Sequence, residues 1–250
     1  MLPAAAARAK PDGYTIVVGS NGTLTVNPQI RNTGYTHESF VALGRMASVP
    51  LGWAVRTSDE INSMKDLVAH LKSNPRTKFT SVGAGSSVHL AAALWAESLG
   101  IKDLVHIGNR GGRGAIVKLL SGEVKFITVS ATNFPSQLKK GIGDLRPLAG
   151  TSDGRWEYAD QIPTLMEQGF NQSFYSWWGL FTPTGTPQAV LSTLRAAVKK
   201  VVTHPDMAAT MKKFYFTPAY ADHTALAKII AGDLAINRKA LSSLGKLRKK

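Results

Sequence analysis

Apolar positions along this chain follow two patterns that alternate, one typical of β-strands and one typical of α-helices. Continuous β-branched or apolar runs predict strands at residues 14–18, 51–55, 78–82, 104–107, 124–129 and 145–149. Apolar residues three or four positions apart predict helices at 64–74, 88–100, 115–121, 187–201 and from 223 onward, with a short one near 135–140. Strands that alternate with helices predict an α/β fold whose sheet is mainly parallel and covered on both faces.

The predicted helix starts carry capping residues. Ser63 precedes a helix that has Asp66 as the acidic member of a capping box. Thr186 is the predicted N-cap of another helix, because Pro187 follows it and proline is favoured at the first helical position. Asp222 is the predicted N-cap of the last helix.

The junction after the strand at 78–82 carries the strongest functional signal. Its loop, Gly83–Ser87, places two glycines and two serines directly before a helix. Because the first helical turn leaves its N–H groups unpaired at the positive end of the helix dipole, this loop predicts an anion site. A dinucleotide-binding fingerprint matches less well, since Val88 stands where a third glycine is needed. The remaining alternative is a tight turn without a ligand.

Length and composition leave the compartment open. The 250 residues, 44% of them hydrophobic, suffice for one large domain or two lobes. The absence of cysteine excludes disulfides and thiolate chemistry. No apolar run approaches the roughly 20 residues that cross a bilayer. The first ten residues lack the apolar segment of a signal peptide, so the chain is either cytosolic or starts upstream of this numbering.

The net charge of +14 is unevenly distributed. Residues 195–250 contain twelve Lys or Arg against three Asp and no Glu. Such a balance favours an anionic partner, which includes nucleic acid, anionic lipid and acidic metabolites. A nucleic-acid or polyanion binder is therefore an alternative function, although only the aromatic residues 214–216 lie near the lysines. A solvated helical face is the simpler explanation.

Enzymatic and metal chemistry have little support in the sequence. The six histidines share no metal-ligand spacing, so we predict no metal and no cofactor. The glycine-rich segment 108–115 lacks the Lys-Ser/Thr pair of a phosphate loop, although Arg110 and Arg113 are suited to bind an anion. No G-x-S-x-G elbow is present. We expect a binding protein that is not an enzyme, with an α/β transferase or hydrolase as the lower alternative.

Six segments, in order, resemble the periplasmic solute-binding receptors of tripartite tricarboxylate transporters, called Bug-type or TctC-like proteins. They are PDGYTIVVGSNGTLTVNPQI (11–30), GAGSSVHLAA (83–92), HIGNRGGRGAIVKLLSGEV (106–124), DLRPLAGTS (144–152), QIPTLMEQGF (161–170) and WWGLFTPTGTPQAV (177–190). The resemblance implies a two-lobed α/β fold of the periplasmic-binding-protein (type II) kind. Lobe one would comprise residues 1–56 and 175–250, and lobe two residues 57–174.

The same resemblance implies a function. Such receptors are periplasmic, trap a small carboxylate between their lobes and deliver it to a membrane permease. The carboxylate is a dicarboxylate, a tricarboxylate or a similar organic acid. Family members begin with a signal peptide and a strand-loop-helix-strand unit that this chain lacks. We therefore expect an incomplete lobe one that exposes apolar surface and favours self-association.

The resemblance also implies ligand-binding positions. In lobe one they are Ser20, Asn21 and Thr23, and in lobe two they are Ser81, Gly83, Ala84, Gly85, Ser86, Ser87, His89 and Ser130. Asn109 and Arg110 stand where the family usually has tyrosine and lysine. Because of these two differences, the resemblance does not identify the acid.

Overall fold

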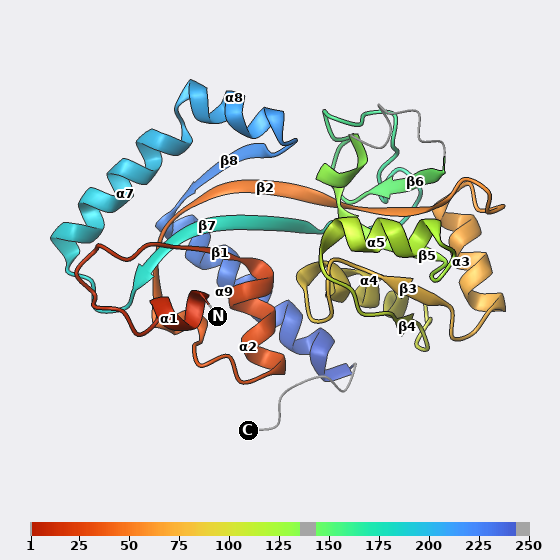
Figure 1. The fold of residues 1–250 in the computed structure, drawn as a ribbon, viewed down its shortest axis with the longest axis horizontal. Coiled ribbons are helices and arrows are strands. Elements are labelled where there is room, and N and C mark those ends of the chain that lie inside the picture. Colours follow the sequence, from red (N-terminus) through yellow and green to blue (C-terminus); the bar gives the residue numbers. More distant parts are fainter. Residues whose placement is uncertain (1, 136–143, 244–250) are drawn as a thin grey trace. The chain divides into compact units, whose positions relative to one another are not determined.

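The computed structural model describes residues 2–135 and 144–243. The chain folds into two compact units: unit 1 is Met1–Ser48 with Trp177–Lys250, and unit 2 is Val49–Ser176. The chain enters unit 2 within strand β2 (Phe40–Arg56) and leaves it within β7 (Tyr175–Pro183), the two longest strands in Figure 1. The lobe limits expected from the resemblance fall at the end of β2 and just before β7.

Unit 1 is built on antiparallel strand pairs. Strand β1 (Val17–Ser20) pairs with β7, and β8 (Thr217–Asp222) pairs with the first part of β2. The long helix α9 (His223–Ser243) packs against β8 and against the π-helix η1 (Gly22–Val26). The other elements of unit 1 are α1 (Leu2–Ala6), α2 (Asn27–Ile30), η2 (His37–Ser39), α7 (Gln188–Val202) and α8 (Pro205–Lys213).

Unit 2 contains a mixed sheet with helices α4 and α5 packed against strand β5. β3 pairs in parallel with both β4 and β5, whereas β5 and β6 pair antiparallel with the second part of β2. In chain order the elements are α3 (Met64–Ser73), β3 (Lys78–Thr80), α4 (Ser87–Ser98), β4 (Val105–His106), α5 (Gly111–Leu120), β5 (Phe126–Ser130), η3 (Ala131–Asn133) and β6 (Leu145–Gly150).

Large aromatic side chains form the centre of unit 2. Trp53, Trp95 and Phe126 are fully buried, and the rings of Phe79 and Phe126 stack with centroids 5.1 Å apart. Trp95 and its neighbours make α4 apolar on most of its surface, so this helix is buried against the sheet. The core therefore fixes α4, and with it the loop that precedes the helix.

Strand directions correct the expectation of mainly parallel sheets. The pairs β1–β7, β2–β5, β2–β6 and β2–β8 are antiparallel, and the two pairs of β3 are parallel. The apolar pattern of a strand reports its burial and not the direction of its neighbour. The expected α/β class with two compact parts is found, but long-range pairing decided how its strands run.

Two of the three predicted helix caps are confirmed. The Asp66 N–H donates to Ser63 Oγ at 3.1 Å, and the Ala225 N–H donates to Asp222 Oδ1 at 2.8 Å. The prediction for Thr186 was wrong by one residue, because Pro187 is the N-cap and the Thr186 hydroxyl donates to the Pro183 carbonyl at 2.8 Å. The helix expected near 135–140 lies largely outside the described residues.

Candidate functional site

Polar residues gather at one edge of the unit 2 sheet. Since β3, β4 and β5 are parallel, their carboxyl ends meet at the same edge. Ser81 follows β3, Asn109 follows β4, and Ser130 is the last residue of β5. The loops that leave this edge lead into α4 and α5, so two helix starts lie beside these side chains.

The β3–α4 loop uses several of its predicted donors internally. Ser86 caps α4, because its Oγ accepts the His89 N–H at 3.1 Å and donates to the Gly83 carbonyl at 2.8 Å. The Gly85 N–H donates to His89 Nδ1 at 3.1 Å, and the Gly83 N–H donates to Ser81 Oγ at 3.4 Å. The φ angles of +154° at Gly83 and +73° at Gly85 explain the two glycines. Gly83, Gly85 and Ser86 therefore shape the loop.

Other donors of the same loop make no hydrogen bond within residues 2–135 and 144–243. They are the N–H groups of Ala84, Ser87 and Val88, together with the Ser87 hydroxyl. Ala84 is exposed and Ser87 is half-buried, so solvent or a solute reaches this turn. Free N–H groups at the positive end of a 12-residue helix suit a carboxylate.

Asn109 connects the two loops at this edge. Its Nδ2 donates to the Ser81 carbonyl and, at 3.3 Å, to Thr80 Oγ1. The Gly111 N–H donates to the Val82 carbonyl at 2.9 Å, which adds a backbone link. The sequence identified this segment only as a glycine-rich turn and missed the role of Asn109, because pairing between β3 and β4 creates the contact.

His106 lies directly beside Ser81. Its Nε2 is 3.0 Å from Ser81 Oγ, and its ring stacks on the ring of His89 with centroids 4.0 Å apart. Burial lowers the pKa of His106 to about 4, so the imidazole is neutral at pH 7. Sequence spacing gave no signal for this pair, since residues 89 and 106 belong to different elements.

The contact between Ser81 and His106 differs from a nucleophile and its base. Ser81 is fully buried, and its Oγ also lies 3.2 Å from the Gly83 carbonyl that accepts its proton. A histidine with a pKa near 4 is a weak base at neutral pH. The arrangement therefore gives little support to a hydrolase.

The predicted positions of unit 1 form a hydrogen-bonded turn. Ser20 Oγ and Thr23 Oγ1 lie 3.0 Å apart, and the Thr23 N–H donates to Ser20 Oγ at 3.3 Å. Asn21 Oδ1 accepts the Gly22 N–H at 3.0 Å at the start of η1. The segment leads into the π-helix η1, and π-helices occur often at functional sites.

Ser130 and the two arginines of the glycine-rich turn occupy different surroundings. The Ser130 hydroxyl accepts the Thr132 hydroxyl at 3.1 Å, and the Ser130 carbonyl accepts Asn133 Nδ2 at 2.9 Å. Arg110 immediately precedes α5 and Arg113 lies in its first turn, and both are exposed. The arginines are thus available to an anion at the same end of α5.

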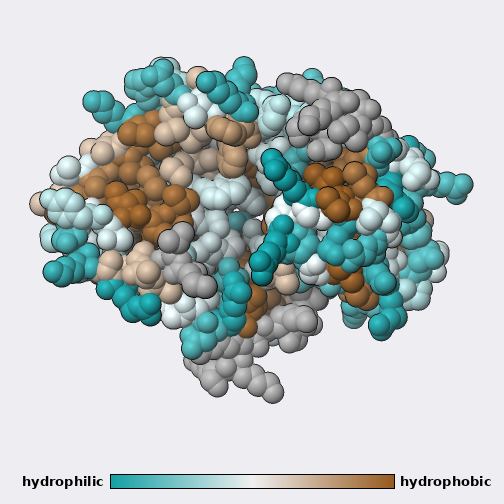
Figure 2. Space-filling model, viewed as in Figure 1, coloured by the Kyte–Doolittle hydropathy of each residue, from teal (hydrophilic) through white to brown (hydrophobic). Residues whose placement is uncertain are grey.

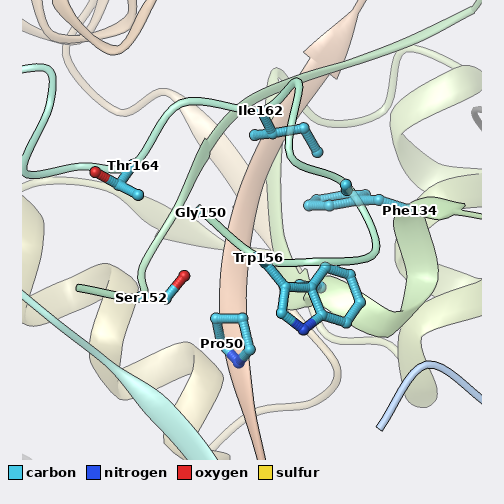
Figure 3. A pocket seen from close by; sticks show the side chains of 9 residues that line it. Pro50, Phe134, Gly150, Ser152, Trp156, Ile162 and Thr164 are labelled. Carbon is cyan, nitrogen blue, oxygen red and sulfur yellow. The ribbon is translucent and has the colours of Figure 1, made fainter. Parts of the chain in front are cut away.

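A small pocket in unit 2 is lined in part by Ala131, the residue that follows Ser130. Figure 3 shows Trp156, Phe134 and Ile162 around it, and the oxygen of Ser152 points inward. The cavity volume is about 10 Å³, which is enough for about one water molecule. The remaining lining residues are Pro50, Gly150, Ala159 and Thr164. This pocket is too small for an organic acid.

In the described parts of the chain, no three His, Asp or Glu side chains come together as a metal site. No helix in the same residues has the length and apolar character needed to cross a membrane.

The sequence of this chain matches a known family over nearly its full length. The family described as "Tripartite tricarboxylate transporter family receptor" (TctC) matches residues 2–245. A UPF0065 protein of Bordetella pertussis is 30% identical over 202 residues, which are 80% of this chain and 62% of that protein. This chain therefore spans less than two thirds of the length of that relative.

Solved structures agree with the family match. A TctC solute binding protein from Polaromonas has a TM-score of 0.78 and 30% identity, with 96% of this chain and 82% of that chain covered. The periplasmic binding protein BugD has a TM-score of 0.83 and 25% identity, with 99% and 83% covered. Family match and fold lead to one conclusion: the chain belongs to the tripartite tricarboxylate transporter receptor family.

Proposed function

We propose that this chain is the receptor part of a tripartite tricarboxylate transporter and binds a small organic acid outside the cytoplasm. The observation that carries the proposal is the start of α4 together with the turn before it, where the N–H groups of Ala84, Ser87 and Val88 and the Ser87 hydroxyl make no bond within the described residues. These donors suit one carboxylate group. The chain's net charge of +14 also attracts anions.

Two proteins with the same fold are described with carboxylate ligands. A protein of R. palustris is described with adipate, at a TM-score of 0.86 and 23% identity. MatC from Rhodopseudomonas palustris is described with bound malate, at 0.81 and 20%. At these identities the likeness concerns the fold alone. We take a di- or tricarboxylate as the class to be tested and leave the individual acid to the experiment.

The proposed role is binding and delivery without catalysis. Ser20, Asn21 and Thr23 of unit 1 stay proposed ligand-binding positions, and the membrane subunits of the transporter are the proposed partners of the loaded receptor. The proposed location is the periplasm. The internal hydrogen bonds of the β3–α4 loop support a structural role for Gly83, Gly85 and Ser86, so the proposed ligand contacts of this loop are Ala84, Ser87 and Val88.

A thermal-shift panel tests this function. The panel contains malate, adipate, citrate, glutamate and benzoate, with glucose and magnesium chloride as non-acid controls. A ligand at about 100 times its Kd adds about 2.7 kcal/mol of stability. At least one acid is expected to raise Tm, and the rise should be smaller in Ser87→Ala. If a sugar or a cation stabilises the protein and no acid does, the proposal is wrong.

A further inference from the structure

Two histidines from different elements contact the β3–α4 loop at two points. His89 Nδ1 accepts the Gly85 N–H at 3.1 Å, and His106 Nε2 lies 3.0 Å from Ser81 Oγ. The Ser86 N–H donates to the Gly83 carbonyl at 3.2 Å and closes a turn; Ser81 precedes this turn and Gly85 lies within it. The pair therefore contacts the loop before its turn and within it.

Hydrogen-bond geometry fixes the proton on the His89 ring. The lone pair of His89 Nδ1 accepts an N–H, so a neutral His89 carries its proton on Nε2. The single proton of the Ser81 hydroxyl has two acceptors within reach, the Gly83 carbonyl at 3.2 Å and His106 Nε2 at 3.0 Å. With either direction of the bond, His106 Nε2 and Ser81 Oγ are hydrogen-bonded. Each ring thus makes one directed bond to the loop.

The aromatic core holds the two rings in place. Their planes are inclined by 26°, with centroids 4.0 Å apart. The Phe79 ring meets the His106 ring edge-on at 5.1 Å and lies 5.9 Å from the His89 ring. Phe79 in turn stacks on the fully buried Phe126. The orientation of the imidazoles is thus set by residues that the loop itself does not contain.

We propose that His89 and His106 are a stacked pair of positioning residues, which hold the β3–α4 loop in the shape that leaves the first turn of α4 open to a carboxylate. His106 is hydrogen-bonded to Ser81 and His89 accepts from Gly85, while the ligand contacts Ser87 and its neighbouring N–H groups. The role rests on the proposed function, because a positioned loop matters only if the loop binds a solute.

Conservative substitutions distinguish positioning from simple packing. His89→Asn keeps an acceptor near the place of Nδ1, and His106→Gln keeps an amide that can donate or accept a hydrogen bond near the place of Nε2. His89→Leu and His106→Leu fill space without either bond. His70→Gln, on α3, serves as a control histidine of the same unit.

Amide exchange in the free protein provides the first measurement. The exchange of the Gly85 N–H, followed by NMR, should become about tenfold faster in His89→Leu and stay near the parent rate in His89→Asn and His70→Gln. Equal rates in the leucine and asparagine variants would overturn the role of the His89 bond. This measurement needs no ligand, so it judges the pair even if the proposed function fails.

Acid binding provides the second measurement. Using malate and adipate in calorimetric titrations, Kd should rise about tenfold in His106→Leu, and His106→Gln should restore most of the affinity. Loss of affinity in both variants, or in neither, would overturn the positioning role of His106. If the parent protein binds neither these acids nor the rest of the panel, the proposed function fails while the exchange result stands.

Discussion

Ser86 and Ser87 are adjacent serines at the start of α4, and we expect the removal of the Ser86 hydroxyl to lower stability and that of the Ser87 hydroxyl to lower ligand affinity. In Ser86→Ala the helix loses its N-cap and the Gly83 carbonyl loses a donor. In Ser87→Ala no hydrogen bond within the described residues is lost, because the Ser87 hydroxyl makes none there. The serine-to-alanine change therefore removes a structural hydroxyl at residue 86 and a proposed ligand-binding hydroxyl at residue 87.

The expected magnitudes follow from these contacts. Loss of a serine N-cap costs about 1 kcal/mol, within a range of roughly 0.5–2 kcal/mol. The second bond of Ser86 adds to this, so we expect Ser86→Ala to lose about 1.5 kcal/mol. In a chain of this size that lowers Tm by roughly 3–6 °C. Ser87→Ala should stay within about 0.5 kcal/mol of the parent, and its affinity for the stabilising acid should fall about tenfold.

Urea denaturation measures the free energy of global unfolding of each variant, and amide exchange along α4 measures the free energy of local opening. Urea gives the total stability at an unchanged m-value, and exchange shows whether the loss is local to the helix start. Calorimetry with the acid found in the panel measures affinity. Equal destabilisation by Ser87→Ala and Ser86→Ala would contradict the two assigned roles, as would an unchanged stability of Ser86→Ala.

Three further predictions concern other groups. Because burial lowers the pKa of His106 to about 4 from an unfolded value near 6.5, the unfolded chain binds the proton more readily, so stability should fall between pH 6.5 and 4. Urea titrations across this range should show a flatter dependence in His106→Gln, and identical curves would contradict the assignment. Burial of Asp59 opposes its charge, but hydrogen bonds from Lys125 (2.8 Å) and Arg56 (3.1 Å) lower its pKa. Asp59→Asn should therefore cost about 2 kcal/mol at pH 7 and progressively less at lower pH, and a neutral effect in urea denaturation would refute this. Figure 2 shows apolar surface on unit 1. Among the large side chains of this unit, Val18 is 53% and Tyr14 94% exposed. Light scattering should detect concentration-dependent self-association that Val18→Ser reduces, and a monomer at every concentration would contradict the expectation.

Local sequence determined much of the fold and the place of the candidate site. Helical periodicity and side-chain caps such as Ser63 and Asp222 depend on neighbours within four residues, so they could be read from the chain. The glycines and serines at 83–87 identified a strand-to-helix turn, because positive φ angles and capping oxygens are local requirements.

Tertiary structure decided what the local pattern leaves undetermined. The direction of β2 depends on strands about a hundred residues away in the chain, and burial patterns do not record that direction. Which donors of the 83–87 loop remain available was also decided there, since His106 and Asn109 reach Ser81 only when β4 pairs with β3. Hydrogen bonds between distant segments require a fixed register, and that register comes from the packed sheet and not from the sequence of the loop.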